Sequence, residues 1–450
     1  MKTVSSNHAK SVAQMLDTGM FTSKQLCDAL GLSQPSMSRV LKSMGSEVIK
    51  TSIHGSIQYL LKDHARSHLV SHISRVTVDG QLQRLGVLEP VRPEGFLLVA
   101  VDGRDSYSEG LPWWLFDMRP QGYLGRAYAR KNAERLALPE RLGDWSDAHV
   151  LQALKLNGSD LCGHLLVGEG AEQMFINMPT PTPVPLDGRA QAYAKLSALA
   201  DAGEVAGSSA GGEQPKFTSY VETDTGAAHV IVKFSALDSN PVSERWRDLL
   251  LAEHHALEVL QQAGIPAAQT RIVDSESQRF LEVARFDRIG ALGRSALVSL
   301  AALDAEFLGL GTTWYEITQA LVQEGCVVPE AMPSVQLLWA YGTLIGNTDM
   351  HAGNLSFTSD SGRPYRLAPA YDMTPMAFAP RAGGSMANDL RAANIVAAIR
   401  GDVWRQAYGL AQLYAERLRR DERFRARFFP CMDALTLHLD GAKERIGRIA

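Results

Sequence analysis

LIGNTDMHAGNLSF, residues 344–357, holds an aspartate and an asparagine five positions apart, Asp349 and Asn354, with a short loop between them. A carboxylate can take a proton from an attacking hydroxyl, and an amide oxygen is a suitable ligand for a magnesium ion. A loop of this length can hold both groups on one wall of a cleft. The stretch therefore predicts a site for phosphoryl transfer, with Asp349 as the general base and Asn354 as a metal ligand.

The same Asp–Asn spacing occurs in the catalytic loop of protein kinases. Eighteen residues past Asn354, the segment LAPAYDMTP carries Asp372 behind an apolar lead-in. An aspartate after such a short strand predicts a second oxygen ligand for magnesium, with phosphates and waters completing the octahedron. No Phe-Gly pair follows Asp372, so the usual protein-kinase triplet is absent.

The segments upstream supply the parts of a small nucleotide-binding lobe. AAHVIVKFS (227–235) predicts a strand with Lys233 near its end, where the ammonium can pair with nucleotide phosphates. The amphipathic pattern of 245–265 predicts a helix carrying Glu253, which can form an ion pair with Lys233 and fix its position. RFLEVARFDR (279–288) predicts a strand leading out of the lobe, and its backbone is the expected hinge for adenine over Glu282, Val283 and Ala284.

Together these segments closely resemble the HipA family of bacterial serine/threonine kinases, the toxin kinases of toxin–antitoxin pairs. The matching pieces are SSAGGEQPK, VIVKF, AEHHALEVLQQAGIP, EVARFDR, GNTDMHAGNLSF and LAPAYDM, which span about residues 207–374. The resemblance implies an α+β fold with two protein-kinase-like lobes, and a reaction that uses ATP and Mg²⁺ on a protein substrate. By position it implies that Asp349 is the general base and that Lys233 binds phosphate. It likewise implies that Asn354 and Asp372 are the metal ligands.

The segment GSSAGGEQPK (207–216) lies just before the Lys233 strand, where a loop that covers the nucleotide phosphates belongs. It matches neither the Walker pattern nor the glycine-rich loop of protein kinases. Gly211 and Gly212 still let backbone N–H groups turn toward an anion, and Lys216 adds a positive charge. We therefore interpret it as an ATP-binding loop. The alternative is an ordinary flexible surface turn.

The resemblance also predicts a switch in this loop. In the HipA family the matching serine can be phosphorylated by the kinase itself, and the loop then swings out and inactivates the enzyme. Alignment on Lys216 predicts self-phosphorylation at Ser209, which also counts among the ATP-binding residues, with Ser208 as the alternative site.

Near the N-terminus, FTSKQLCDALGLSQPSMSRVLKSM (21–44) has a helix-turn-helix pattern. Thr22 or Ser23 can cap a first helix that ends at Leu30, with Leu26, Ala29 and Leu30 on its inner face. Ser33 can cap a second helix, whose apolar face is formed by Met37, Val40 and Leu41. In VIKTSIHGSIQYLL (48–61) apolar and polar residues alternate, and a turn is expected at His54-Gly55. This pattern predicts a two-stranded wing.

This module predicts DNA binding. Residues 1–65 hold seven Lys/Arg and four Asp/Glu, a balance of 7 − 4 = +3. In the major groove the second helix would present Gln34, Ser36 and Arg39 to base edges, whereas Lys42 and Lys50 would meet phosphates. The alternative is a small helical domain that binds another protein.

Composition limits the other possibilities. The net charge is −4, so no basic field draws the whole chain to nucleic acid. The four cysteines lie far apart, which argues against a disulfide framework and a paired-thiolate zinc site. The start, MKTVSSNHAK, lacks a signal-peptide core, and no apolar run approaches the roughly 20 residues needed to span a bilayer. We expect a cytoplasmic protein without membrane association.

The expected domain organisation has three parts. Residues 1–65 form a winged helix-turn-helix domain, 66–286 the N-terminal kinase lobe with the glycine/serine loop, and 287–450 a mainly helical catalytic lobe. SLAALDAEFLGLG (299–311) stands where the family commonly has a His-Gln-Glu-Asp-like segment, so the resemblance does not extend to the choice of substrate or the regulation.

A fused helix-turn-helix also departs from the family, in which the DNA-binding antitoxin is usually a separate protein. With the DNA-binding module fused to the kinase, we do not expect a standard separate antitoxin to be needed. An antitoxin-like regulator is still a possible partner, and so is a second copy of the chain, because helix-turn-helix proteins often read palindromic half-sites as dimers. Two other functions stay open: a transcription regulator whose kinase-like domain only binds a ligand or is inactive, and a small-molecule kinase.

Overall fold

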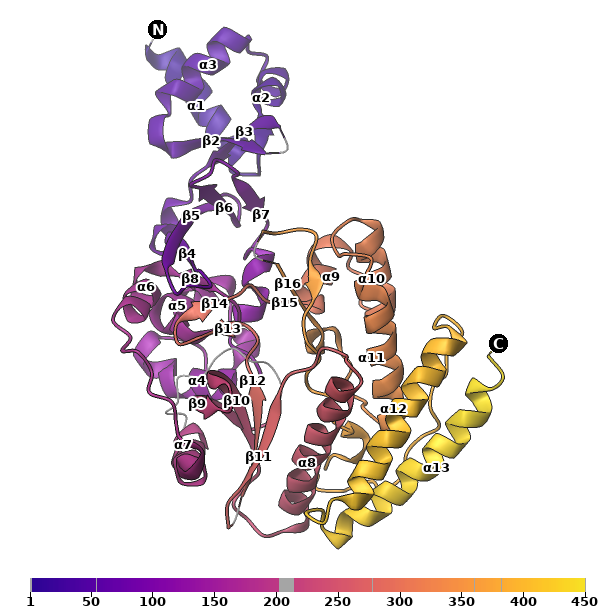
Figure 1. The fold of residues 1–450 in the computed structure, drawn as a ribbon. Coiled ribbons are helices and arrows are strands. Elements are labelled where there is room, and N and C mark those ends of the chain that lie inside the picture. Colours follow the sequence, from indigo (N-terminus) through magenta and orange to yellow (C-terminus); the bar gives the residue numbers. More distant parts are fainter. Residues whose placement is uncertain are drawn as a thin grey trace.

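The computed structural model describes residues 2–53, 55–201, 214–276, 278–359, 361–381 and 383–449. The N-terminal domain lies at one end of the molecule and is followed by a β-rich middle region (Figure 1). A small sheet comes next, and long helices from the C-terminal half lie beside it (Figure 1). None of the described helices has the length and apolar character that crossing a bilayer requires.

The N-terminal domain has the winged helix-turn-helix arrangement. Three helices pack on a small sheet with strand order β1-β3-β2; they are α1 (Lys2–Leu16), α2 (Ser23–Leu30), α3 (Gln34–Ser43), β1 (Phe21–Thr22), β2 (Val48–Ile53) and β3 (Ser56–Leu61). Thr22 caps α2 and forms a reciprocal capping box with Gln25. Gly31, at φ +63°, makes the turn that leads to α3.

Two details of this domain differ from the sequence expectation. Ala29 is exposed, and Cys27 is buried on the inner face of α2 in its place, because the helix turns its Leu26 side toward α1 and α3. Helix α1 was not predicted, although its Val12 and Leu16 are fully buried in the same core. Met37, Val40 and Leu41 form the predicted buried face of α3.

The wing, the hairpin of β2 and β3, packs against the middle region. Thr51 donates a hydrogen bond to Asp105 over 2.6 Å, and the N–H of Arg92 donates to the backbone oxygen of Leu61 over 2.9 Å. Leu60 on the wing shares a buried cluster with Val91 and Leu97. The wing therefore joins the N-terminal domain to the rest of the chain.

The middle region is a five-stranded sheet, order β7-β6-β5-β4-β8, with helices on it. Its elements are β4 (Ser71–Val76), β5 (Leu82–Val91), β6 (Gly95–Ala100), β7 (Ser106–Ser108), a 3₁₀ helix (Trp113–Met118), α4 (Gly122–Leu136), α5 (Asp147–Asn157), β8 (Leu165–Val167) and α6 (Gly168–Ile176). Phe96, Leu115 and Leu151 are at most 1% exposed in its core. The connection after α5, residues 158–164, runs toward the small sheet.

The small sheet has four antiparallel strands in the order β11-β12-β10-β9. These are β9 (Lys216–Thr223), β10 (Gly226–Phe234), β11 (Thr270–Asp274) and β12 (Arg279–Ala284), accompanied by α7 (Arg189–Asp201) and α8 (Pro241–Gln262). Register places Lys233 opposite Lys216 on β9 and opposite Leu281 on β12. The strand that carries Lys233 is thus fixed on both sides.

The C-terminal half is mainly helical. Its elements are β13 (Arg288–Ile289), β14 (Gly293–Arg294), β15 (Val298–Ser299), α9 (Leu300–Phe307), α10 (Trp314–Gln323), α11 (Ala331–Ile345), β16 (Ser356–Thr358), β17 (Arg366–Leu367), α12 (Gly401–Arg420) and α13 (Phe429–Ile446). Leu249 and Leu257 of α8 are buried in the same cluster as Trp404 and Tyr414 of α12. Helix α8 therefore connects the small sheet to the helical half.

Candidate active site

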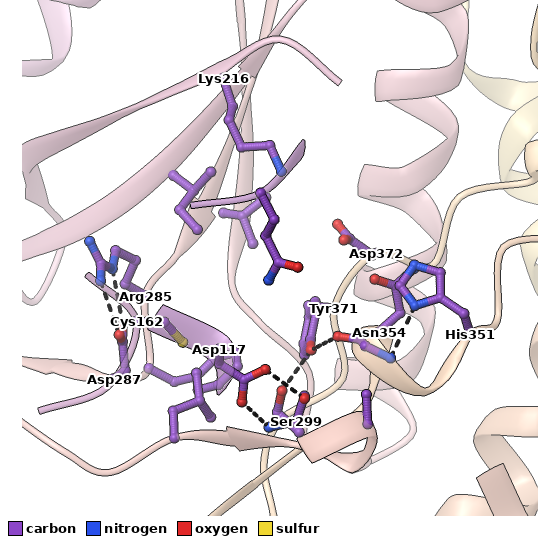
Figure 2. A pocket seen from close by; sticks show the side chains of 18 of the residues that line it. Asp117, Cys162, Lys216, Arg285, Asp287, Ser299, His351, Asn354, Tyr371 and Asp372 are labelled. Carbon is purple, nitrogen blue, oxygen red and sulfur yellow. Dashed lines mark hydrogen bonds and ion pairs between the residues drawn. The ribbon is translucent and has the colours of Figure 1, made fainter. Parts of the chain in front are cut away.

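A cavity of about 330 Å³ lies where the small sheet, the helical half and the middle region meet. Figure 2 shows its polar side chains facing one another across the opening. Its lining residues, grouped by origin, are Phe116, Asp117, Gln121 and Cys162 from the middle region; Lys216, Ile231, Lys233, Val283, Ala284, Arg285, Phe286 and Asp287 from the small sheet and its exit; and Leu297, Ser299, Ala301, His351, Gly353, Asn354, Ser356, Tyr371 and Asp372 from the helical half.

The predicted ion pair between Lys233 and Glu253 forms at one wall of this cavity. The Nζ atom of Lys233 lies 2.6 and 2.8 Å from the two carboxylate oxygens of Glu253, and Thr374 donates to Glu253 over 2.8 Å. Lys233 also donates to Asp372. Burial alone would lower the pKa of Lys233, but the Asp372 and Glu253 carboxylates outweigh it and raise that pKa. The ammonium is therefore held charged and fixed.

The loop with Asp349 and Asn354 follows α11, which ends at Gly346 in a left-handed conformation (φ +79°). Asn354 donates from Nδ2 to the backbone oxygen of Asp349 over 2.8 Å. Asn347, which sequence reasoning missed, accepts from the N–H of Asp349 at 3.0 Å and donates to the backbone oxygen of Asp372 at 3.2 Å. Asn347 therefore ties the two predicted catalytic segments together.

Asp349 itself has a side chain that is 52% exposed, so a substrate hydroxyl can approach it from solvent. His351 lies beside it, with 3.9 Å between Nε2 and the Asp349 carboxylate. The backbone oxygen of His351 accepts from the Trp314 indole over 2.8 Å, which anchors the middle of the loop to α10.

Asp372 has a positive φ of +53°, and it is one of two non-glycine residues with a positive φ in the described part of the chain. An L-residue adopts this conformation at a cost, and such strain concentrates at functional sites. Tyr371 precedes it, and its hydroxyl group is 2.7 Å from Ser356 Oγ and donates to the backbone oxygen of Gly353 over 3.0 Å. These bonds fix the segment that aims Asp372 into the cavity.

Two of the three residues predicted as the adenine hinge line the cavity. Val283 and Ala284 line the cavity, but the Glu282 carboxylate points to the other side of the sheet, where Arg189 lies 2.8 Å away and Tyr193 donates over 2.6 Å. Alternation along β12 explains this, because neighbouring side chains face opposite sides of a sheet. The cavity is instead bordered by the residues that follow the strand, Arg285, Phe286 and Asp287.

A buried charge network fixes this exit from β12. Asp160 of the middle region lies 3.0 Å from Arg285 and 2.7 Å from Arg288, and both arginines also pair with Asp287. Burial opposes ionisation of Asp160, but the arginines outweigh it and hold its pKa below the usual range. The N–H of Gly163 donates to Asp287 over 2.9 Å. Residues of the middle region therefore hold the segment that follows β12 in place. No local sequence signal indicated this contact.

Lys216 is almost fully buried and points into the cavity from β9 (Figure 2). Its charge contributes to lowering the pKa of Asp372, after the larger influences of burial, which opposes the shift, and Lys233. The other residues predicted in the glycine/serine loop lie outside the described residues; they are Ser208, Ser209, Gly211 and Gly212.

Four of the residues predicted to meet DNA lie on α3, on the side away from the core, whereas Lys50 is exposed on β2 of the wing. Gln34, Arg39 and Lys42 are exposed and Ser36 is half-buried. Gln34 accepts from Ser23 over 2.7 Å, and Arg39 Nε donates to the backbone oxygen of Pro35 over 3.2 Å. Helix α3 therefore presents a polar face to solvent, as the recognition helix of a helix-turn-helix domain does.

Two family models match the chain: the HipA-like C-terminal domain over residues 208–425, and the YjjJ-like toxin middle domain over residues 69–176. Over 440 residues, the chain is 36% identical to "Toxin YjjJ" of Escherichia coli (strain K12), which covers 97% of this chain and 99% of that protein. The chain belongs to the HipA-like toxin family.

Solved structures agree with this HipA-like assignment. The fold is similar to that of HipA from Shewanella oneidensis MR-1, solved with HipB and its operator DNA, with a TM-score of 0.58 and 16% identity over 84% of this chain and 99% of that one. A weaker likeness, with a TM-score of 0.40 and 13% identity over 53% of this chain and 94% of that one, is to the Helicobacter pylori proinflammatory kinase CtkA. The HipA-like chain therefore has the two-lobed, kinase-like α+β fold that its sequence predicted.

The HipA-like site contains oxygen donors that fit a magnesium ion. Because Asn354 uses Nδ2 on Asp349, its amide oxygen remains as an acceptor, and the Asp372 carboxylate lines the same cavity. Within the described residues no cluster of three or more His, Cys, Asp or Glu side chains could hold a metal. Two protein oxygens with phosphates and waters are the usual way to hold Mg²⁺ beside a nucleotide.

Proposed function

We propose that this chain is an ATP- and Mg²⁺-dependent serine/threonine protein kinase that acts as a toxin and can phosphorylate itself. One observation carries the proposal: a buried Lys233 ammonium is held by Glu253 and Asp372 at the wall of a cavity that Asn354 also lines. This combination suits phosphoryl transfer, because the protein mainly positions the phosphates and balances charge.

Each residue would have a specific task. Lys233 and Lys216 would pair with phosphates, and Asn354 and Asp372 would hold Mg²⁺, which neutralises phosphate charge when bound. Asp349 would accept the proton of the attacking serine or threonine hydroxyl. The apolar walls at Ile231, Val283 and Phe286, together with the backbone at the exit of β12, would enclose adenine.

Self-phosphorylation at Ser209, or at Ser208, stays part of the proposal. Its support is the place of the glycine/serine loop directly before β9, whose Lys216 enters the cavity. A phosphate on this loop would carry about −1.5 to −2 charges at pH 7 and would compete with the nucleotide for the lysines. Gly211 and Gly212 would supply the backbone freedom that such a switch needs.

The N-terminal domain is proposed to bind DNA through α3, and a homodimer would match palindromic half-sites. Because the wing packs on the middle region, we expect α3 rather than the wing to enter the groove. The related HipA was solved with HipB and operator DNA, which supports an antitoxin-like regulator as a further partner. We also propose that the protein works in the cytoplasm. The proposed domains are the DNA-binding domain at 1–65, the N-terminal kinase lobe at 66–286 and the catalytic lobe at 287–450.

Phosphoryl transfer from radiolabelled ATP to lysate proteins and to the chain itself tests the proposal. We expect labelled protein with the wild-type chain and none with Asp349→Asn. Labelled metabolites without labelled protein would instead identify a small-molecule kinase. A wild-type chain that shifts a DNA duplex but never transfers phosphate would identify a regulator with an inactive kinase-like domain.

A further inference from the structure

Helix α3 begins at Gln34, and the side chain of this residue is tied to helix α2 through its amide oxygen. The Ser23 hydroxyl donates to Oε1 of Gln34 over 2.7 Å, and the Cys27 thiol donates to the same oxygen over 3.7 Å. Ser23 is the first residue of α2, and Cys27 is buried on the inner face of that helix. Two donors from α2 therefore converge on one atom of Gln34.

These two bonds determine which end of the Gln34 amide can meet a ligand. A glutamine amide has one oxygen with two lone pairs and one nitrogen with two N–H donors. Ser23 and Cys27 use both lone pairs of the oxygen and turn it toward α2. The nitrogen is then the end of this exposed side chain that points away from α2. Gln34 is thus oriented to donate hydrogen bonds to a ligand and not to accept them.

Arg39 adds donors at the same end of α3. Its Nε atom donates to the backbone oxygen of Pro35 over 3.2 Å, and its Nη2 atom donates to Ser36 Oγ over 3.4 Å. The side chain is therefore folded back along the helix toward the residues that directly follow Gln34. A guanidinium group has donors and no acceptor. The exposed start of α3 thus presents N–H groups from two side chains.

The edges of the bases differ in what they offer to such a surface. In the major groove guanine presents two acceptors, N7 and O6, whereas adenine presents the N7 acceptor beside an N6 donor. Glutamine pairs with adenine when its nitrogen donates to N7 and its oxygen accepts from N6. In Gln34 that oxygen already accepts from Ser23 and Cys27, so the N6 donor of adenine would be left without an acceptor. Guanine has no such donor at this edge.

We propose that Gln34 selects guanine over adenine at the base pair it faces, and that Ser23 is the positioning residue that sets this preference. The inference rests on the proposed DNA binding through α3, and it adds which base the helix selects. The partner is duplex DNA with guanine at that position of the major groove.

Selection of duplexes from a random pool by the full chain, for the wild-type protein and for Gln34→Ala, first locates the contacted base pair. It is the position at which Gln34→Ala loses base preference while the other positions keep theirs. Competition binding then compares duplexes with guanine and with adenine at this position. The wild-type protein should bind the guanine duplex at least about 5-fold more tightly.

Ser23→Ala tests the positioning role. Without the hydroxyl, one lone pair of the Gln34 oxygen becomes available to adenine, so the preference for guanine should fall to within about 2-fold. Ser23→Thr retains a hydroxyl and should keep the wild-type preference. Ser43→Ala is the matched control, because the Ser43 hydroxyl at the other end of α3 donates to the backbone oxygen of Val40 over 2.7 Å. It should also keep the wild-type preference.

Three results would overturn the inference. The first is a wild-type preference for adenine at the contacted position, and the second is a Ser23→Ala variant with the wild-type ratio of affinities. The third is a Gln34→Ala variant that weakens all duplexes equally, because that pattern indicates a contact to phosphate. If the wild-type protein enriches no duplex at all, the proposed DNA binding itself is wrong, which is a separate result from a wrong base preference.

Discussion

Asn354 donates a hydrogen bond from its side-chain nitrogen to the backbone oxygen of Asp349, at 2.8 Å. The bond connects the two residues whose spacing predicted the chemistry, and it leaves the amide oxygen of Asn354 as an acceptor. Asn354→Ala should therefore raise the Mg²⁺ concentration needed for half-maximal phosphoryl transfer by about 10-fold or more. A Mg²⁺ titration of the reaction rate measures this shift.

The matched control is Asn157→Ala in the middle region, where the asparagine donates to the Tyr128 hydroxyl over 2.7 Å. It should leave the Mg²⁺ requirement as in the wild-type protein. The assignment of Asn354 as a metal ligand is wrong if Asn354→Ala lowers the rate by the same factor at every Mg²⁺ concentration.

Glu253→Gln should lower both stability and activity. Glu253 is fully buried, and the change leaves the Lys233 ammonium with Asp372 as its remaining carboxylate partner. Breaking one side of a buried ion pair costs about 3 kcal/mol of the free energy of unfolding. The rate should also fall, since Lys233 would no longer be aimed at the phosphates. Urea unfolding and initial-rate kinetics measure the two effects.

Glu172→Gln separates these effects, because Glu172 is a buried partner of Arg84 at 3.0 Å and is not one of the lining residues of the cavity. We expect lower stability and an unchanged rate for this variant. Equal loss of rate in both variants would show that stability alone explains the result for Glu253.

A pH effect on stability should come from Asp248 on α8. Burial raises its pKa to about 6, against a hydrogen bond from the N–H of Arg425 and nearby arginines that lower it. The folded protein therefore binds more protons than the unfolded chain between about pH 4 and pH 6. This contribution to stability is present below pH 4 and is lost as the pH rises through 6.

Asp248→Asn removes that titration. The free energy of unfolding of the variant, relative to the wild-type protein, should therefore rise by about 3 kcal/mol between pH 4 and pH 7. Urea-unfolding midpoints at intervals of one pH unit test it. A difference that stays constant over this range would refute the assignment of the titration to Asp248.

Arg39→Ala should weaken DNA binding, because Arg39 is exposed on α3 near its predicted contact with base edges. A duplex first selected by the wild-type protein from a random pool provides the probe. The variant should bind it about 10-fold more weakly and with relaxed base preference. Lys131→Ala removes a positive charge from α4 and should leave the affinity unchanged. Equal affinity of the Arg39 variant and the wild-type protein would remove α3 from the proposed role.

Local patterns account for the parts of the fold that could be predicted. The Lys233–Glu253 pair connects a strand and the helix that follows it, only 20 residues apart, and both have clear periodicity. The Thr22 cap and Gly31 likewise predicted α2 and the turn after it. Ser33 precedes α3 as predicted, but its side chain makes no capping hydrogen bond. The cavity wall that Arg285, Phe286 and Asp287 form beyond the end of β12 at Ala284 was not predicted, because it depends on the arginine network rather than on local sequence.

The middle region could not be predicted as part of the site. Asp117 and Ser299 are 182 positions apart, and Asp160 reaches Arg288 across 128 positions. No periodic pattern links residues at such separations, and Asp117 sits in an aromatic stretch that reads as ordinary core. Asn347 was missed for a different reason. The functional role in this loop was given to its neighbour Asp349, although Asn347 is hydrogen-bonded to both Asp349 and Asp372.

The central claim is that the cavity transfers phosphate from ATP. Mass spectrometry of the purified chain, with and without ATP and Mg²⁺, tests it most directly, with Asp349→Asn measured alongside. The account predicts phosphate on Ser209 of the wild-type chain only when ATP and Mg²⁺ are present, and none on the variant. Phosphate on the Asp349→Asn chain at the wild-type level, or an unmodified wild-type chain that also leaves every lysate protein unlabelled, would contradict it.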